Sequence, residues 1–235
     1  MTNVIYVLGL SYCGSSLCNL LLNTHPEVVG LGEVHRLYNE RDYRFCGKCG
    51  PEPCTRYADW EDDFYDHVAE IDQTKWLVDS SKNIYHMTQY CTYYPVLLSK
   101  NVYQFVASFK AHYPDYKIED MVYIYGRQYA KYIEKYPLVP RITYKQLATD
   151  PQGTVDEIYE YVGLDTFPID GWFKPQNHVF GGNAAVIQQT QPVFEPVADK
   201  YIGHEHEIFY DDSIVDVTID TKIFDLMHQL GHTRT

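Results

Sequence analysis

Short apolar runs alternate with amphipathic stretches along most of this chain. Residues 4–10 form the first apolar run, a turn-forming stretch follows at residues 11–14, and residues 15–23 have apolar positions at helical spacing. The His25-Pro26 pair ends this helix, and residues 28–31 predict a second buried strand. The chain therefore opens with a predicted strand, loop, helix and strand.

The same alternation continues towards the C-terminus. Strands are predicted at residues 76–79 and 96–98, each followed by a polar turn and a helical stretch. Helices are predicted over residues 121–136, 154–162 and 221–229. Because strands and helices alternate repeatedly, we expect a three-layer α/β sandwich with a central, mostly parallel sheet.

Two regions depart from this alternation. Approximately residues 39–63 are rich in charged residues, Gly, Pro and Cys, which predicts a Cys-rich insertion outside the core sheet. Beyond Pro168 the chain is rich in Gly, Asn, Gln and Pro until the last predicted helix, and we expect it to follow the surface. The length of 235 residues fits one domain over residues 1–235 that carries this insertion.

Charge and hydropathy narrow the classes of partner. The formal net charge is −13, whereas binding to nucleic acid or to an anionic membrane requires clustered basic residues, so we expect neither partner. The first residues lack the basic leader and long apolar region of a signal peptide, and no segment is apolar enough to span a bilayer. We therefore expect a cytoplasmic protein in which any anionic ligand is held by locally placed groups.

The loop between the first predicted strand and helix is suited to binding an anion, because it offers backbone amides, hydroxyls and a helix N-terminus. It comprises Ser11, Tyr12, Cys13, Gly14, Ser15, Ser16 and Leu17. The loop lacks the Gly-Lys-Ser/Thr ending of nucleoside-triphosphate P-loops, which disfavours a Mg²⁺-dependent kinase. Taken alone, it fits a simple turn with an N-capping serine equally well.

Four blocks in order carry a resemblance to a known family. The first is this loop with its helix, followed by His25-Pro26 and Gly32-Glu33; the second is Leu-Val-Asp-Ser-Ser-Lys at residues 77–82. The third, residues 98–108, places a basic residue eight positions before a helical serine, and the fourth begins at residues 142–151. Together they resemble the sulfotransferases that use 3′-phosphoadenosine-5′-phosphosulfate (PAPS), in the Gly-Glu subgroup.

The fourth block continues to residues 162–164, and a weaker match extends to His178 and residues 181–183. The resemblance implies a P-loop NTPase-like sulfotransferase architecture. It also implies transfer of a sulfuryl group from PAPS to a hydroxyl or amine of a small-molecule, glycan or peptide acceptor.

The resemblance assigns donor-binding roles to individual residues. The phosphosulfate is expected on the loop at residues 11–17, with Lys100 and Ser108 holding the 3′-phosphate. Tyr144, Gly182 and Asn183 fall in matching donor-binding segments.

Three residues are expected to act on the reacting groups. Glu33 matches the general base, His35 is the alternative base, and Lys82 is expected to contact the donor or the leaving phosphate. Without the resemblance, Glu33 is better explained as a strand-terminal carboxylate that is paired with Arg36 or caps a helix, and Lys82 is explained equally well as a solvated lysine.

Two positions depart from the family pattern. Tyr12 stands where the family has Arg or Lys, so it brings a phenol instead of a positive charge. Val186 stands where the family often has Arg, which leaves that end of the donor site in doubt. These departures keep open a catalytically lapsed PAPS-binding module, beside a small-molecule kinase with a P-loop as a further alternative.

The cysteines of the predicted insertion have a spacing that occurs in zinc sites. Cys46, Cys49 and Cys54 offer three thiolates, and a histidine such as His35 or His67 could complete a tetrahedron. Reduced thiols packed in a loop and a local disulfide are the alternatives, and we assign no metal ligand from the sequence. A zinc-stabilised interaction domain is accordingly the structural alternative to an enzyme.

Overall fold

A computed structural model describes residues 1–35, 37, 46, 48–49, 54–57, 60, 63–83, 91–172, 178–181, 208, 210 and 212–233. Five parallel strands form one sheet in the order β2-β3-β1-β4-β5. They are β1 (Asn3–Leu8), β2 (Val28–Gly32), β3 (Trp76–Lys82), β4 (Thr92–Ser99) and β5 (Arg141–Thr143). The predicted parallel sheet is therefore confirmed.

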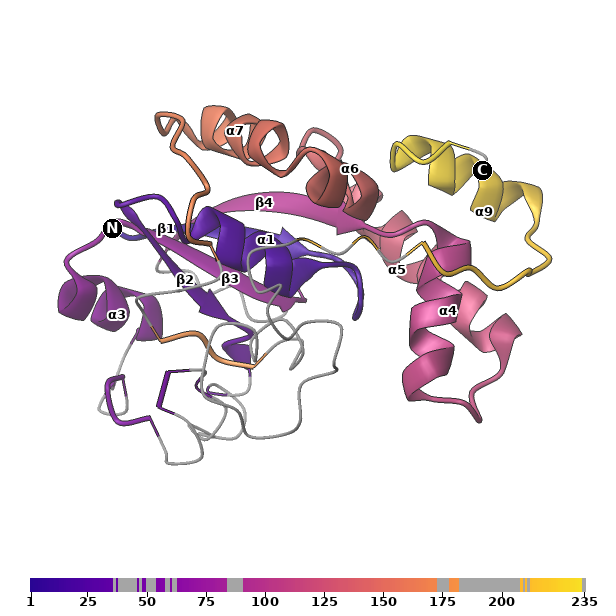
Figure 1. The fold of residues 1–235 in the computed structure, drawn as a ribbon, viewed down its shortest axis with the longest axis horizontal. Coiled ribbons are helices and arrows are strands. Elements are labelled where there is room, and N and C mark those ends of the chain that lie inside the picture. Colours follow the sequence, from indigo (N-terminus) through magenta and orange to yellow (C-terminus); the bar gives the residue numbers. More distant parts are fainter. Residues whose placement is uncertain are drawn as a thin grey trace.

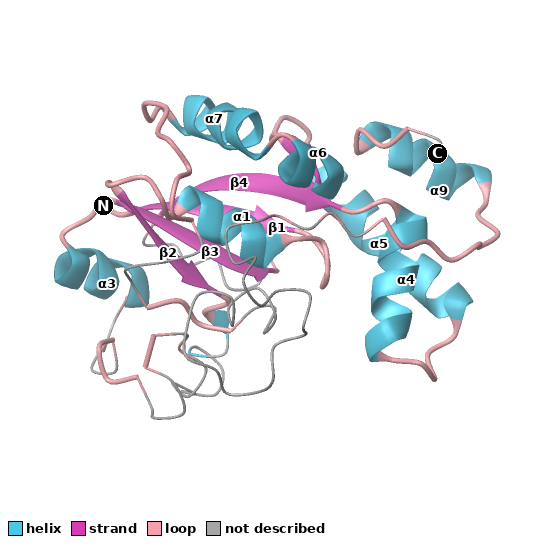
Figure 2. Cartoon of the chain, in the orientation of Figure 1, coloured by secondary structure: helices cyan, strands magenta, loops and turns pink. Residues whose placement is uncertain are grey.

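Helices cover both faces of the sheet (Figures 1 and 2). One face is covered by α1 (Ser15–Leu22), α6 (Tyr144–Thr149) and α7 (Pro151–Val162). The other is covered by α3 (Phe64–Asp72), α4 (Val102–His112) and α5 (Ile118–Lys135), with α9 (Thr221–Gln229) packed on α5. This is the three-layer α/β sandwich that the alternation predicts.

The central strand β1 is buried on both faces, which explains its uninterrupted apolar sequence. Val4, Tyr6 and Leu8 belong to the core beneath α3, α4 and α5, while Ile5 and Val7 belong to the core beneath α1 and α7. All five side chains have 0% exposure. A parallel sheet covered by helices on both sides requires this pattern.

Polar side chains fix helix α1 against the sheet although the whole helix is buried. Asn19 Oδ1 accepts a hydrogen bond from Gly32 N (3.0 Å), and Asn23 Oδ1 accepts one from Gly30 N (2.7 Å). These bonds satisfy amides of β2, which is an edge strand of the described sheet. Helix α1 and strand β2 are therefore held in one register.

Three tyrosines of α5 bind backbone carbonyls at the carboxyl ends of two strands. Tyr125 donates to Lys100 O (3.0 Å) and Tyr129 to Leu98 O (3.0 Å) at the end of β4. Tyr132 donates to the carbonyl of Lys82, the last residue of β3 (2.6 Å). Their rings fill the core while their hydroxyls donate to buried carbonyls at the strand ends, a combination that an amphipathic aromatic side chain provides.

The predicted elements agree with the observed ones in most places, and α9 has the predicted bounds. Helix α3 was missed because its sequence directly follows the polar insertion; Asp63 caps it and accepts hydrogen bonds from Tyr65 N and Asp66 N. Most of the predicted insertion at residues 39–63 lies outside the described residues. No helix among the described residues is both long and apolar enough to cross a lipid bilayer.

Replacing Tyr129 by Phe should lower the free energy of unfolding by about 1–2 kcal/mol, because the buried carbonyl of Leu98 loses its donor. Urea denaturation measures this change. The matched control is Tyr123→Phe on the same helix, whose side chain is 64% exposed and whose replacement should change stability by less than about 0.5 kcal/mol. Equal effects of the two substitutions would contradict the role given to the buried hydroxyls.

Candidate functional site

The carboxyl ends of the five strands bring the predicted functional residues to one edge of the sheet. The loop at residues 9–14 follows β1, Glu33 follows β2, and Lys82 is the last residue of β3. Lys100 directly follows β4, and Tyr144 directly follows β5. In open parallel sheets, ligands bind at this edge, between adjacent strands whose outgoing connections run in opposite directions. Here these strands are β1, which leads to β2 on one side, and β4, which leads to β5 on the other.

The loop after β1 is shaped by close backbone packing. Tyr12 has φ 66° and Gly14 has φ 97°, and both values lie in the left-handed region. A Cβ on Gly9 would lie 2.6 Å from Leu98 O and 2.8 Å from Cys13 Sγ, so the loop passes very close to β4. Cys13 is fully buried, which raises the pKa of its thiol, and its amide donates to Leu10 O (3.4 Å). Cys13 therefore supports the loop conformation.

Helix α1 begins at this loop without a side-chain cap. Its first helical bond runs from Cys18 N to Gly14 O (3.0 Å). First-turn amides of a helix point along its axis away from the helix, and the helix dipole makes this end partially positive. The start of α1 is consequently suited to a phosphate or sulfate group.

Glu33 and Lys82 form an ion pair across the carboxyl ends of β2 and β3. Their side chains are only 16% and 13% exposed, respectively. Lys82 has φ 68°, a strained conformation for a lysine, and Tyr132 holds its carbonyl group. The carboxylate and ammonium groups are thus fixed beside the loop; Arg36, the alternative partner for Glu33, lies outside the described residues.

Asp79 and Ser81 organise the end of β3 before Lys82. Asp79 Oδ1 accepts from Ser81 N (2.7 Å), and Tyr65 donates to Asp79 Oδ2. Ser81 Oγ in turn accepts from His35 N (3.0 Å), which ties the chain after β2 to β3. Complete burial of Asp79 raises the pKa of its carboxyl group to about 6, against the lowering effect of these hydrogen bonds.

Lys100 and Ser108 lie together, as the family resemblance implies. Lys100 Nζ donates to Ser108 Oγ (2.8 Å) and lies 4.5 Å from the centroid of the Tyr144 ring. A Cβ built on Gly14 would lie 2.6 Å from Cδ2 of the same ring. The ring of Tyr144 therefore separates the loop from Lys100 and contacts both.

Tyr12 turns its ring towards the end of α4. It stacks on His112 with 4.3 Å between ring centroids and 26° between planes, and it packs edge-on against Phe109 at 5.9 Å. Partial burial, followed by Tyr113 and Glu33, raises the pKa of Tyr12 to about 12. Its phenol is therefore neutral at pH 7, and Tyr12 adds no charge to the loop.

Some of the remaining residues singled out in the sequence are described by the structure, and others lie outside its described part. Ser11 is exposed, whereas Ser15, Ser16 and Leu17 are buried in the first turn of α1. Gly182, Asn183 and Val186 lie outside the described residues, so their predicted relation to the donor stays a prediction.

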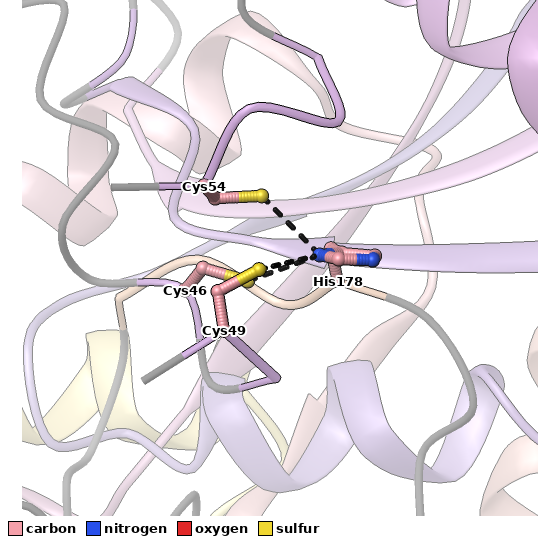
Figure 3. A group of neighbouring side chains, drawn as sticks. All are labelled: Cys46, Cys49, Cys54 and His178. Carbon is pink, nitrogen blue, oxygen red and sulfur yellow. Dashed lines mark hydrogen bonds between the residues drawn. The ribbon is translucent and has the colours of Figure 1, made fainter. Parts of the chain in front are cut away.

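A second cluster of reactive side chains lies next to this edge. Cys46, Cys49 and Cys54 surround His178, and the ligand atoms of all four lie within 4.8 Å of one another (Figure 3). The sequence had suggested His35 or His67 as the fourth member of the group and assigned no metal ligand. His178 was noticed only as part of a weak motif match, because a partner 124 residues from Cys54 leaves no local spacing signal.

No protein-family model and no curated protein sequence matches this chain. A comparison of structures finds similarity to the sulfotransferase domain from the Synechococcus PCC 7002 olefin synthase, with a TM-score of 0.63 and 15% sequence identity. The match covers 100% of this chain and 96% of that domain. The chain therefore has the fold of a sulfotransferase domain.

The raised pKa of Asp79 should make stability depend on pH. Because the pKa is about 6 when folded and 3.8 when unfolded, the folded state retains a proton between these values that the unfolded state loses. The contribution of Asp79 to the free energy of unfolding is complete below about pH 4 and decreases by roughly 3 kcal/mol as the pH rises to 6.

Chemical denaturation from pH 4 to pH 7 measures this effect as the difference in the free energy of unfolding between the unaltered protein and the Asp79→Asn variant. Asp66→Asn on α3 serves as a control for the loss of a carboxylate elsewhere. A stability difference between the protein and Asp79→Asn that stays constant across this range would show that Asp79 ionises normally.

Proposed function

We propose that this protein transfers a sulfuryl group from PAPS to a hydroxyl or amine of an acceptor. The observation that carries the proposal is the convergence of two cationic side chains with the N-terminus of α1. Lys82 lies on one side of the loop, and Lys100 lies across the Tyr144 ring from it. A chain with a net charge of −13 thus gathers cations where a nucleotide with two anionic ends requires them.

The two ends of the donor would bind different groups. The phosphosulfate would accept hydrogen bonds from the start of α1 and the loop at residues 11–17. Lys100 and Ser108, whose polar atoms are 2.8 Å apart, would share one oxygen-rich group such as the 3′-phosphate. Lysine supplies the charge without the bidentate geometry of arginine, so selectivity for this phosphate would rest on charge.

The transfer step assigns Glu33 and Lys82 complementary roles. The acceptor oxygen or nitrogen bonds to sulfur while the bond from sulfur to the bridging oxygen breaks, and 3′-phosphoadenosine-5′-phosphate (PAP) leaves. Glu33 takes the acceptor proton, and the Lys82 ammonium stabilises the charge that develops on the bridging oxygen. In this proposal Lys82 exchanges its bond with Glu33 for one with the donor, which leaves the carboxylate available to the acceptor.

This division of roles accounts for the substitution at Tyr12. The Tyr12 ring stacks on His112, and its phenol carries no charge at pH 7. The ammonium of Lys82 replaces the missing cation from the neighbouring strand. His35 is the alternative base, and its amide donates to Ser81 Oγ at the end of β3 (3.0 Å).

A PAPS-binding module without catalysis is the second candidate, favoured by the neutral residue at Tyr12 and by the pairing of Glu33 with Lys82. Calorimetric titration with PAPS, together with transfer of radiolabelled sulfate to a panel of alcohols, phenols, glycans and amines, separates the two functions. Turnover supports the transferase. Tight binding of PAPS without transfer to any acceptor supports the module.

Replacing Lys100 by Met should weaken PAP binding roughly 10- to 100-fold and leave binding of adenosine 5′-monophosphate almost unchanged. Methionine preserves the apolar contact with Tyr144 while removing the charge. Calorimetry with both nucleotides provides the measurement, and Lys75→Met, at the opposite edge of the sheet, is the control. Equal losses for the two nucleotides would remove Lys100 from the 3′-phosphate site.

Replacing Glu33 by Gln should reduce turnover by roughly 10²- to 10⁴-fold, because the acceptor loses its proton acceptor. PAP affinity should stay the same or rise slightly, since a negative charge near the phosphosulfate site is removed. Glu27→Gln, an exposed residue before β2, is the control. Steady-state kinetics that match the control would exclude Glu33 as the base.

A further inference from the structure

The cluster of Cys46, Cys49, Cys54 and His178 has a geometry that hydrogen bonding does not explain. The three sulfur atoms lie 3.3, 3.4 and 3.2 Å from the same atom, His178 Nδ1, and all point towards it (Figure 3). A ring nitrogen carries either one proton or one lone pair, so it can serve only one of three sulfurs. An atom bonded to all four groups accounts for the convergence.

The spacing matches tetrahedral zinc coordination. Zinc–sulfur bonds of about 2.3 Å and zinc–nitrogen bonds of about 2.0 Å, at tetrahedral angles, separate sulfur from nitrogen by about 3.5 Å. The observed distances of 3.2–3.4 Å are close to this value. The Cys46-x2-Cys49 spacing is also typical of zinc ligands that lie on one turn. We propose that these four side chains bind one zinc ion.

The surroundings of the cluster indicate a structural metal. Cys46 and Cys54 are each 1% exposed, while Cys49 and His178 are half-buried. Tyr57 packs its ring edge-on against the His178 imidazole at 5.8 Å, and its hydroxyl is held by Asp72 of α3. Four protein ligands close the coordination sphere, which leaves no position for a reacting water.

The zinc site is connected to the proposed active site through Phe180. Phe180 bridges to both Gly32 and Cys46, so the three backbones lie side by side. Phe180 N donates to Leu31 O (2.7 Å), and Glu33 N donates to Phe180 O (2.6 Å). A Cβ on Gly32 would lie 2.2 Å from Phe180 O, so only glycine permits this approach.

Two consequences follow for Glu33. The metal anchors residues 178–181 against the carboxyl end of β2, and a Cβ on Gly181 would lie 3.3 Å from that of Glu33. His178 and its metal therefore act as positioning groups for the carboxylate and do not touch the reacting atoms. Zinc binding is independent of the sulfotransferase proposal, whereas the effect on turnover rests on it.

Elemental analysis of the chain, purified under reducing conditions without chelators, should find about one zinc per chain. Cobalt substitution should give the thiolate charge-transfer absorption and the intense visible bands of a tetrahedral site. Reduced, folded protein that holds no zinc and takes none up from a zinc-buffered solution would overturn the proposal. A disulfide between two of these cysteines in folded protein would overturn it as well.

Ligand variants test the assignment of the four side chains. Cys49→Ser should lower zinc affinity at least about 100-fold, whereas His178→Cys, which preserves four ligands, should keep most of it. Cys91→Ser, a cysteine outside the cluster, is the matched control and should keep one zinc. Full zinc affinity in Cys49→Ser would refute the assignment. If that variant fails to fold, the unaltered chain is treated with a mercurial reagent, which binds thiolates. Release of the zinc then supports cysteine ligands, and retention of the zinc contradicts them.

Hydrogen exchange tests the positioning role without reference to activity. Removal of the metal should speed exchange of the Glu33 and Phe180 amides at least about tenfold, while amides of β1 and β4 remain protected. Unchanged exchange at Glu33 and Phe180 would refute the link between the two sites. If the chain transfers sulfate, Cys49→Ser should lower kcat with little effect on PAP affinity, and His178→Cys should restore it.

Discussion

Backbone carbonyl groups at the carboxyl end of a parallel sheet need donors where the neighbouring strands stop, and here three tyrosine hydroxyls of α5 provide them. Tyr125 and Tyr129 bind the end of β4, and Tyr132 binds the carbonyl of Lys82. Lys82 and Lys100 lie at the ends of β3 and β4, where these carbonyls are. The hydrogen bonds that complete the core therefore also fix the backbone that carries both ammonium groups. These three tyrosines of α5 thus have a structural role at the edge of the sheet where the candidate site lies.

Much of the fold could be predicted because its elements carry strong local patterns. The apolar run of β1 and the helical spacing of α1 flank a short loop that contains Gly9 and Gly14, and each element was located to within a few residues. The resemblance to the sulfotransferase family paired Lys100 with Ser108, and their side chains are in hydrogen-bond contact in the structure. The shared fold with a sulfotransferase domain agrees with this reading of the sequence.

What sequence reasoning missed depends on contacts between distant segments. The pairing of Glu33 with Lys82 requires β2 to lie beside β3, and strand order is not encoded in periodicity. His178 joins three cysteines of an earlier segment only because Phe180 pairs with both Gly32 and Cys46. Neither contact has a fixed spacing along the chain, so each becomes visible only once the backbone is folded.

The contact of Gly14 with Tyr144 gives the two halves of the proposed nucleotide site a common wall. Any side chain introduced at residue 14 has to displace the ring on which Lys100 rests. If the proposed donor binds here, a change of shape in the loop at its 5′ end would move the ring that supports Lys100 at its 3′ end. The two ends of the proposed site are therefore mechanically coupled, which would restrict how a preference for one donor could change.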